Sequence, residues 1–283
     1  MESGVSTDQP PGYLYVVSTP IGNMGDFSFR AVDVLRTVAV ILAEDTRHSR
    51  PLLDRYEIAT QTLAYHEHNE ARMTPEIVAR LRRGENVALI SDAGTPLVSD
   101  PGARLVRAAI DDGIRVVPIP GASALLASLV ASGLDAARFT FFGFLPRKGR
   151  ERSASITSLV QLRHTAILYE APGRVAGTLA ELADAGADSR PGVVAREMTK
   201  HFEELRRGTV RELAAYYKDA PPRGEVVILV GGGEAARPTE DELRERARAL
   251  RAEGMSVRDA AAALAAEFGV RRNEAYRVVR EGE

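Results

Sequence analysis

The fold of this chain is decided by residues 87–96, which read VALISDAGTP. Four consecutive apolar residues are typical of a strand that is covered on both faces, as strands are in a parallel sheet. The polar, glycine and proline residues that follow end the strand at once. Ligands bind beyond the carboxyl ends of the strands in an open parallel sheet, so the segment from Ser91 onward is the first place to expect a site.

The same alternation of strand and helix continues on both sides of this stretch. Short apolar runs occupy residues 13–20, 38–45, 62–66, 87–94 and 115–120, with helical patterns between them at 29–37, 48–56, 74–83 and 102–112. This order predicts a mostly parallel sheet with helices packed on its faces. Small residues at 121–133 predict a tightly packed helix after the fifth run.

A second strand-rich unit and a helical tail follow. Strands are expected at residues 139–146, 165–171, 193–199, 204–210 and 225–230, and helices at 150–162, 173–185 and 210–218. Residues 234–238 resemble a linker, and the tail beyond it contains a capping pattern at Ser256 and Asp259 and a glycine break at Gly269. We therefore expect an α/β protein with domains at 12–121 and 122–233, followed by a helix-turn-helix-like extension at 239–283.

Composition excludes several classes of protein. The chain has no cysteine, which excludes disulfides and thiolate metal sites, and its formal net charge of −2 gives no global attraction to a polyanion. No apolar run approaches the roughly 20 residues of a membrane-spanning helix. Residues 1–11 are polar and lack the basic and apolar regions of a signal peptide, so a cytoplasmic protein is expected.

Polar residues follow every predicted strand of the first unit, and they predict a cleft at one edge of the sheet. The first loop lacks the G-x-G-x-x-G spacing of a dinucleotide site, and no P-loop motif occurs anywhere in the chain. Ordinary Rossmann cofactors and P-loop chemistry are therefore disfavoured. His66 and His68 flank an acidic residue, but no further ligand cluster accompanies them, and we expect no metal.

Each polar segment also has a purely structural interpretation. In residues 91–102, Ser99 or Asp100 could cap the helix that begins near Pro101. In residues 44–47, Asp45 or Thr46 is a competent helix cap, and Arg47 could pair with Glu44 on the surface. The basic residues after the 139–146 strand and those in the tail could be solvated charges. These interpretations stay open beside the functional ones.

Several segments, taken together and in order, resemble one known family. They are STPIGN at 18–23, AEDTR at 43–47, SDAGTPLVSDPG at 91–102, PG at 120–121, GFLP at 143–146, YE at 169–170, REMTK at 196–200 and GEV at 224–226. The family is the small-subunit (16S) ribosomal RNA methyltransferase I group, the RNA-modifying branch of the tetrapyrrole methylases. The resemblance runs from about Tyr13 to Val230, and the tail is similar to the family's C-terminal extension.

This resemblance implies a fold and an activity. The family has two α/β domains of the class III methyltransferase type, holds S-adenosylmethionine folded in the cleft between them and usually forms a homodimer. Its product is a 2′-O-methyl group on a cytidine of 16S ribosomal RNA. The rivals are a tetrapyrrole C-methyltransferase of the same fold and a catalytically inactive RNA-binding assembly factor.

The resemblance also assigns expected roles to residues. Those expected at the cofactor are Pro20, Ser91, Asp92, Gly94, Thr95, Pro96, Ala122, Ser123, Tyr169, Glu170, Met198 and Gly224. Those expected at the RNA substrate are Arg47, Asn69, Arg147, Lys148, Arg150 and Lys200. A ribose hydroxyl is a poor nucleophile, so Glu44, Asp45 and His66 are candidates to accept its proton.

Overall fold

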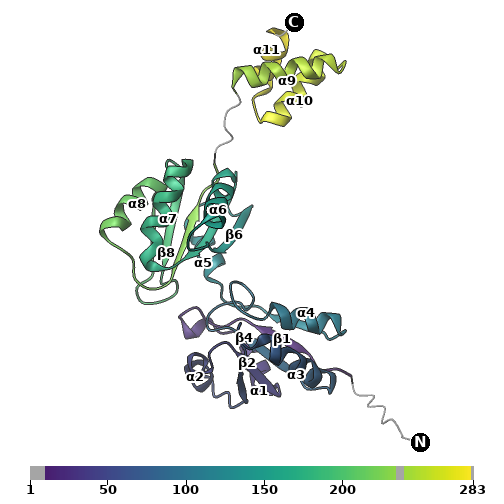
Figure 1. Ribbon diagram of the computed structural model, residues 1–283, viewed down its shortest axis with the longest axis vertical. Helices are drawn as coiled ribbons and strands as arrows, with labels where there is room; N and C mark the ends of the chain where they lie inside the picture. The colour runs from purple at the N-terminus through teal and green to yellow at the C-terminus, as the bar shows by residue number, and fades with distance from the viewer. Residues whose placement is uncertain (1–9, 234–238, 282–283) are drawn as a thin grey trace, which may run out of the picture.

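The computed structural model describes residues 10–233 and 239–281. It contains two five-stranded sheets in succession along the chain, followed by a group of helices, α9 to α11 (Figure 1). The linker predicted at 234–238 and most of the polar opening segment lie outside the described residues. Within the described parts of the chain, no helix is both long and apolar enough to cross a membrane.

The first sheet is entirely parallel. Its strands are β1 (Leu14–Val17), β2 (Val40–Ala43), β3 (Thr62–Ala64), β4 (Val87–Ile90) and β5 (Val116–Ile119), in the spatial order β3-β2-β4-β1-β5. β2 and β4 are buried along their whole length, as their unbroken apolar sequences predict. All five carboxyl ends therefore lie along one edge.

Helices cover both faces of this sheet. They are α1 (Phe29–Thr37), α2 (Thr46–Arg55), α3 (Glu70–Arg82) and α4 (Ala103–Asp111). Side chains of α1 and α2, such as Leu35 and Leu53, share one core with the sheet, whereas Ile77 of α3 and Leu105 of α4 share the other. The helices fix the strand ends between two dry cores.

The second sheet is mixed. Its strands are β6 (Phe139–Phe144), β7 (Thr165–Glu170), β8 (Pro191–Arg196), β9 (Glu204–Thr209) and β10 (Val226–Val230), in the order β6-β7-β10-β8-β9. Only β6 and β7 are parallel, and β10 runs antiparallel to both of its neighbours. The amino end of β10 consequently lies beside the carboxyl ends of β7 and β8, where Val226 pairs with Glu170 and Arg196.

The helices α6 (Arg150–Gln161), α7 (Val175–Leu182) and α8 (Val210–Asp219) pack on one face of the second sheet. Helix α5 (Ala124–Ser132), predicted from its small residues, packs on the other face. Ile21 follows β1 of the first sheet, but it is buried in the core between α5 and the second sheet, together with Leu129 and Ile167. The two halves of the molecule therefore share a packed junction.

The tail forms three helices that pack on one another: α9 (Glu240–Ala252), α10 (Val257–Phe268) and α11 (Arg272–Glu281). Ser256 caps α10 by accepting a hydrogen bond from the Asp259 amide, and Gly269 ends it with a positive φ of 66°. The boundaries 12–121, 122–233 and 239–283 stay predictions.

Candidate active site

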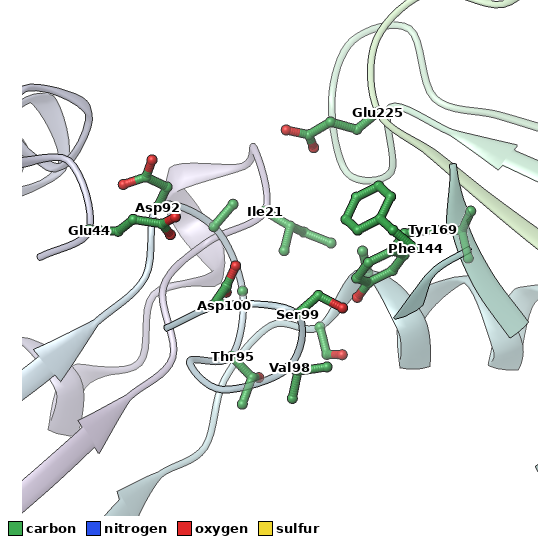
Figure 2. Close-up of a pocket in the computed structure, with 15 residues that line it drawn as sticks. Ile21, Glu44, Asp92, Thr95, Val98, Ser99, Asp100, Phe144, Tyr169 and Glu225 are labelled. Atoms are coloured by element: carbon green, nitrogen blue, oxygen red, sulfur yellow. The ribbon is translucent and has the colours of Figure 1, made fainter. Parts of the chain in front are cut away.

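A cavity of about 320 Å³ lies where the carboxyl edge of the first sheet faces the second sheet (Figure 2). This volume falls within the ~300–1,000 Å³ of small-molecule sites. The first half of the chain supplies one wall, from the segments that follow β1, β2, β4 and β5. The second half supplies Phe144, Tyr169, Glu225 and Val227, from the facing ends of β6, β7 and β10.

Three carboxylates of the first half gather on one side of this cavity: Glu44, Asp92 and Asp100 (Figure 2). Burial, followed by the nearby charges of Asp100 and Asp92, raises the pKa of Glu44. Burial raises the pKa of Asp100 to about 6, with a hydrogen bond from Ser91 opposing the shift. Among the described residues that line the cavity, none is a lysine, arginine or histidine. The cavity therefore favours a positively charged ligand.

The loop at 91–102 owes its shape to unusual backbone conformations. Leu97 and Ser99 have positive φ angles of 72° and 71°, which non-glycine residues rarely adopt. The loop turns back so that Ser99 and Asp100 line the cavity. Neither residue caps α4, as one interpretation of the sequence had them doing: the N-cap is Gly102, and no side chain caps the helix. That structural interpretation was wrong because the loop continues two residues further.

Hydrogen bonds tie this loop to its neighbours. Thr19 and Gly94 exchange backbone hydrogen bonds of 2.8 and 3.1 Å. The Thr95 hydroxyl lies 3.1 Å from that of Ser18 and donates to the carbonyl of Ala122. The ends of β1, β4 and β5 are thereby held together beneath the cavity.

Asp45 and Arg47 form a pair of their own. Asp45 caps α2, and its carboxylate accepts two hydrogen bonds from the Arg47 guanidinium, at 3.1 and 2.8 Å. Arg47 therefore pairs with Asp45 and not with Glu44. These bonds lower the pKa of Asp45 to about 2. The cap interpretation of Asp45 is confirmed, and its carboxylate is a weak proton acceptor.

His66 and Asn69 lie at the end of β3, apart from the cavity-lining residues. The Asn69 side chain accepts a hydrogen bond from the His66 amide and donates one to the carbonyl of Ala64, so it holds the turn closed. The ring of His66 packs edge-on against that of His68. Within the part of the chain that the structure describes, no group of acidic and histidine side chains could hold a metal ion.

Two aromatic rings form the wall on the side of the second sheet. Tyr169 lies edge-on to Phe141 and tilted against Phe144, with ring centroids 4.9 and 5.6 Å away. Burial raises the pKa of Tyr169. Neighbouring Glu170 instead points into the domain, where it accepts a 2.6 Å hydrogen bond from Thr178. Glu170 thus supports the strand end and does not line the cavity.

Lys200 bridges the two halves of the molecule. Its ammonium lies 3.0 Å from the Glu197 carboxylate and 3.1 Å from that of Glu225. Its aliphatic stem passes so close to Gly22 that a Cβ there would overlap it. The Asn23 amide also donates to the Thr199 hydroxyl, at 3.2 Å. Lys200 is therefore already committed to partners within the chain.

A second cavity, of about 260 Å³, adjoins the first. The two share Ile21, Asp92, Ala93 and Glu225 as a common wall. The remaining lining residues come mainly from the loop after β1 and from α2. Lys200 closes one side.

The predicted site residues divide into those that line a cavity and those that do not. Lining one or both cavities are Pro20, Glu44, Ser91, Asp92, Gly94, Thr95, Ser123, Tyr169 and Lys200. Outside both linings are Asp45, Arg47, His66, Asn69, Pro96, Ala122, Glu170, Met198, Gly224, Arg147, Lys148 and Arg150. Of these, Met198 is buried in the core between α5 and the second sheet. Arg147, Lys148 and Arg150 are exposed on the loop and helix after β6.

Sequence reasoning missed Asp100 and Glu225 as cavity residues. Asp100 stands within the SDAGTPLVSDPG motif, so the motif itself was a usable signal. Glu225 precedes its strand, whereas a parallel sheet directs attention to residues that follow strands. The antiparallel direction of β10 brings it to the same edge.

Comparison with known proteins agrees with this architecture. Residues 13–214 match the family described as Tetrapyrrole (Corrin/Porphyrin) Methylases. The chain is 45% identical to a Synechocystis sp. protein named Ribosomal RNA small subunit methyltransferase I, over 96% of this chain and 99% of the relative. A Mesorhizobium japonicum protein of the same name is 48% identical, over 93% of this chain and 90% of the relative.

The solved structure of uroporphyrin-III C-methyl transferase from Thermus thermophilus, complexed with S-adenyl homocysteine, superposes with a TM-score of 0.57. It is 19% identical and covers 78% of this chain and 97% of that chain, a likeness that shows the shared fold. The fold and the family predicted from the sequence are confirmed. The chain belongs to the tetrapyrrole methylases and, within them, to the ribosomal RNA small subunit methyltransferase I family.

Proposed function

We propose that this protein uses S-adenosylmethionine to methylate small-subunit ribosomal RNA, at the ribose 2′-hydroxyl of a cytidine. The observation that carries the proposal is the acidic cavity between the two sheets, lined by four carboxylates and an aromatic wall. The names of the relatives support the RNA substrate. The acceptor atom, a ribose 2′-oxygen, and the nucleobase, cytosine, are those that the sequence resemblance implies.

The residues of the cavity fit the cofactor. S-adenosylmethionine supplies a methyl group on a positively charged sulfonium and also carries a positive ammonium. Glu44, Asp92 and Asp100 give the cavity the opposite charge, and Glu225 is the one carboxylate there that already has an ammonium partner, Lys200. The rings of Phe144 and Tyr169 offer an aromatic surface for an adenine. Gly94, Thr95 and Ser123 line the wall without bulky side chains.

Glu44 is the proton acceptor that the geometry favours. It lines the cavity, and its pKa is raised by burial and by neighbouring carboxylates, which makes it a better base than an ordinary glutamate. Asp45 is held by Arg47 with a low pKa, and His66 lies outside both cavities. When the ribose oxygen gains the methyl group, its proton passes to the Glu44 carboxylate.

Four exposed cations suit a polyanion. Arg147, Lys148 and Arg150 are exposed on the loop and helix after β6, close in sequence to cavity residue Phe144. Arg47 is also exposed, with 89% of its side chain accessible. We assign RNA phosphate contacts to these four exposed residues and not to Lys200, whose side chain is only 27% accessible and whose ammonium lies between two carboxylates.

The rival functions have less support. A tetrapyrrole substrate has no support from the relatives of 45% and 48% identity, both of which are named for ribosomal RNA. An inactive assembly factor would not need a carboxylate of raised pKa beside a cavity of cofactor size. Neither rival explains the names of the relatives.

We also propose a cytoplasmic homodimer with the domain limits predicted from the sequence. Helix α5 leaves Leu126 and Val130 exposed, at 49% and 78% of their surface, which supports an interface on that face. A substrate that is part of the ribosome places the activity in the cytoplasm.

The experiment that tests the function compares ribosomal RNA from cells with and without the gene. Mass spectrometry of the digested small-subunit RNA should find one 2′-O-methylcytidine missing in the deletion strain. Calorimetric titration of the purified protein with S-adenosylmethionine should show binding. An unchanged methylation map would overturn the substrate, and the absence of binding would overturn the enzyme class.

A further inference from the structure

The second cavity borders the first but presents different chemistry. The pair share a wall made by Ile21, Asp92, Ala93 and Glu225. Glu44 and Asp100 line only the first cavity, whereas His48 and Ser49 line only the second. Two molecules, one in each cavity, would therefore lie next to each other at the shared residues. This arrangement suits a donor in one cavity and an acceptor in the other.

Ser49 is the unusual residue of the second cavity. It lies in the first turns of α2, only 3% of its surface is accessible, and its Oγ is buried without a hydrogen-bond partner. Burying a hydroxyl without a partner is unfavourable, and native proteins rarely leave one so. Because this serine also lines a cavity, a ligand there is the natural partner for its hydroxyl.

The rest of the lining combines apolar surface with the charged side chains of Asp92, Lys200 and Glu225. Leu52 and Met24 contribute apolar surface, and Pro20 adds a rigid edge. His48 lines the cavity and is exposed, and a histidine ring can stack on a base. A few polar groups among apolar walls are typical of sites that orient a small ligand.

We propose that the second cavity receives a single nucleoside extruded from the RNA, and that the Ser49 hydroxyl forms a hydrogen bond with its base. This proposal rests on the function proposed above and adds to it the location of the acceptor nucleoside. A base held at Ser49 leaves its ribose toward the shared wall, on the side of Glu44 and the cofactor cavity. Bases in single-stranded RNA are readily splayed out and bound in this way.

The test compares two buried serines. Ser49→Ala removes the unpartnered hydroxyl of a residue that lines the cavity. Ser128→Ala, in α5, is the matched control, because Ser128 is fully buried, its Oγ is equally unpartnered, and it lines neither cavity. Both variants should keep the thermal stability of the natural protein, since no hydrogen bond within the chain is lost.

At saturating S-adenosylmethionine, Ser49→Ala should lower kcat/KM on small-subunit ribosomal RNA about three- to tenfold, the usual effect of one lost hydrogen bond. Ser128→Ala should leave it unchanged. Cytidine added free should inhibit the natural protein and inhibit Ser49→Ala less. The dissociation constant of S-adenosylmethionine should be the same in all three proteins.

Equal kcat/KM values and equal cytidine inhibition for Ser49→Ala and Ser128→Ala would overturn the inference while leaving the proposed function intact. Failure of the natural protein to methylate the RNA would overturn both. A fall in cofactor affinity in Ser49→Ala would also count against the inference, because it would place the hydroxyl in the first cavity.

Discussion

The two halves of the molecule contribute opposite kinds of surface to one cavity. The parallel sheet directs all its carboxyl ends to one edge, and the loops there bring carboxylates such as Glu44 and Asp92. The mixed sheet presents the rings of Phe144 and Tyr169, and the exposed basic residues follow its first strand. On the functions proposed above, the first half supplies most of the negative charge and the proton acceptor, and the second half supplies the aromatic surface and most of the exposed cations.

The largest expected effect comes from the charged side. Glu44→Gln keeps the shape of the side chain but cannot accept a proton. We expect the single-turnover rate of RNA methylation to fall by about 10²–10⁴-fold, the usual contribution of a general base. Asp45→Asn is the matched control: asparagine still caps α2, and the original carboxylate is held by Arg47, so the rate should change little. A larger loss in Asp45→Asn than in Glu44→Gln would reverse the assignment.

Asp100 should give the next largest effect, on cofactor binding. Asp100→Asn removes a negative charge from the cavity, and we expect the dissociation constant of S-adenosylmethionine to rise about tenfold, equivalent to ~1.4 kcal/mol. In the natural protein the affinity should fall as the pH drops through about 6, because the carboxyl becomes protonated there. Calorimetry at pH 5 and pH 7.5 measures both effects. A flat pH profile in the natural protein would contradict the role of this carboxylate.

Asp100 should also affect stability, and this effect should depend on pH in the opposite direction to cofactor affinity. Its pKa is about 6 in the folded protein and 3.8 when unperturbed, so between these values the folded state binds more protons than the unfolded state. The contribution of Asp100 to the free energy of unfolding should therefore decrease as the pH rises through this window. Urea unfolding of the natural protein and of Asp100→Asn across the window isolates that contribution. Parallel pH profiles for the two proteins would refute the shifted pKa.

Neutralising the basic residues of the second half should weaken RNA binding and make it less dependent on salt. With Arg147, Lys148 and Arg150 all replaced by glutamine, the slope of log affinity against log salt should decrease by about 2, since each phosphate contact on a single strand contributes ~0.7. Cofactor affinity should stay unchanged. Glutamine at Arg82, Arg83 and Arg115, near the opposite edge of the first sheet, is the control for position, with thermal stability measured alongside because Arg82 pairs with Asp112 and Arg83 with Glu85. An equal change in both triple variants would indicate nonspecific attraction only.

The smallest expected effect is on the aromatic wall. Tyr169→Leu keeps an apolar side chain but removes the stacking surface, so the dissociation constant of S-adenosylmethionine should rise about threefold. Phe202→Leu serves as the control, because Phe202 is 65% exposed and lines neither cavity. If Tyr169→Leu weakened binding more than Asp100→Asn, the division of roles between the two halves would be wrong.

The sequence predicts which residues gather at the cavity where the parallel sheet determines their position. Residues that follow successive parallel strands must meet at one edge, and Asp92, Gly94 and Ser123 do line one cavity. The position of Asp100 could not be predicted in this way, because it depends on the positive φ angles of Leu97 and Ser99, which turn the loop back. No spacing rule reveals such a turn.

Other differences arise from partners that only the folded chain brings together. Asp45 was an open candidate for the base until the structure paired its carboxylate with Arg47. Lys200 was expected at RNA phosphate, but Glu225 reaches it from 25 residues away in the sequence. Strand direction is a third cause of difference between prediction and structure. Strand β10 runs antiparallel to its neighbours, which brings the residues at its start to the cavity.

The contact between Gly22 and the stem of Lys200 limits how these two halves can be recombined. A chimera that joins the first half of this chain to the second half of a distant relative keeps a tight seam only if glycine stands at 22 wherever a long side chain occupies 200. Any larger residue at 22 would overlap the stem of Lys200 and push the two halves apart. Glycine at position 22 therefore allows the two halves to pack closely together.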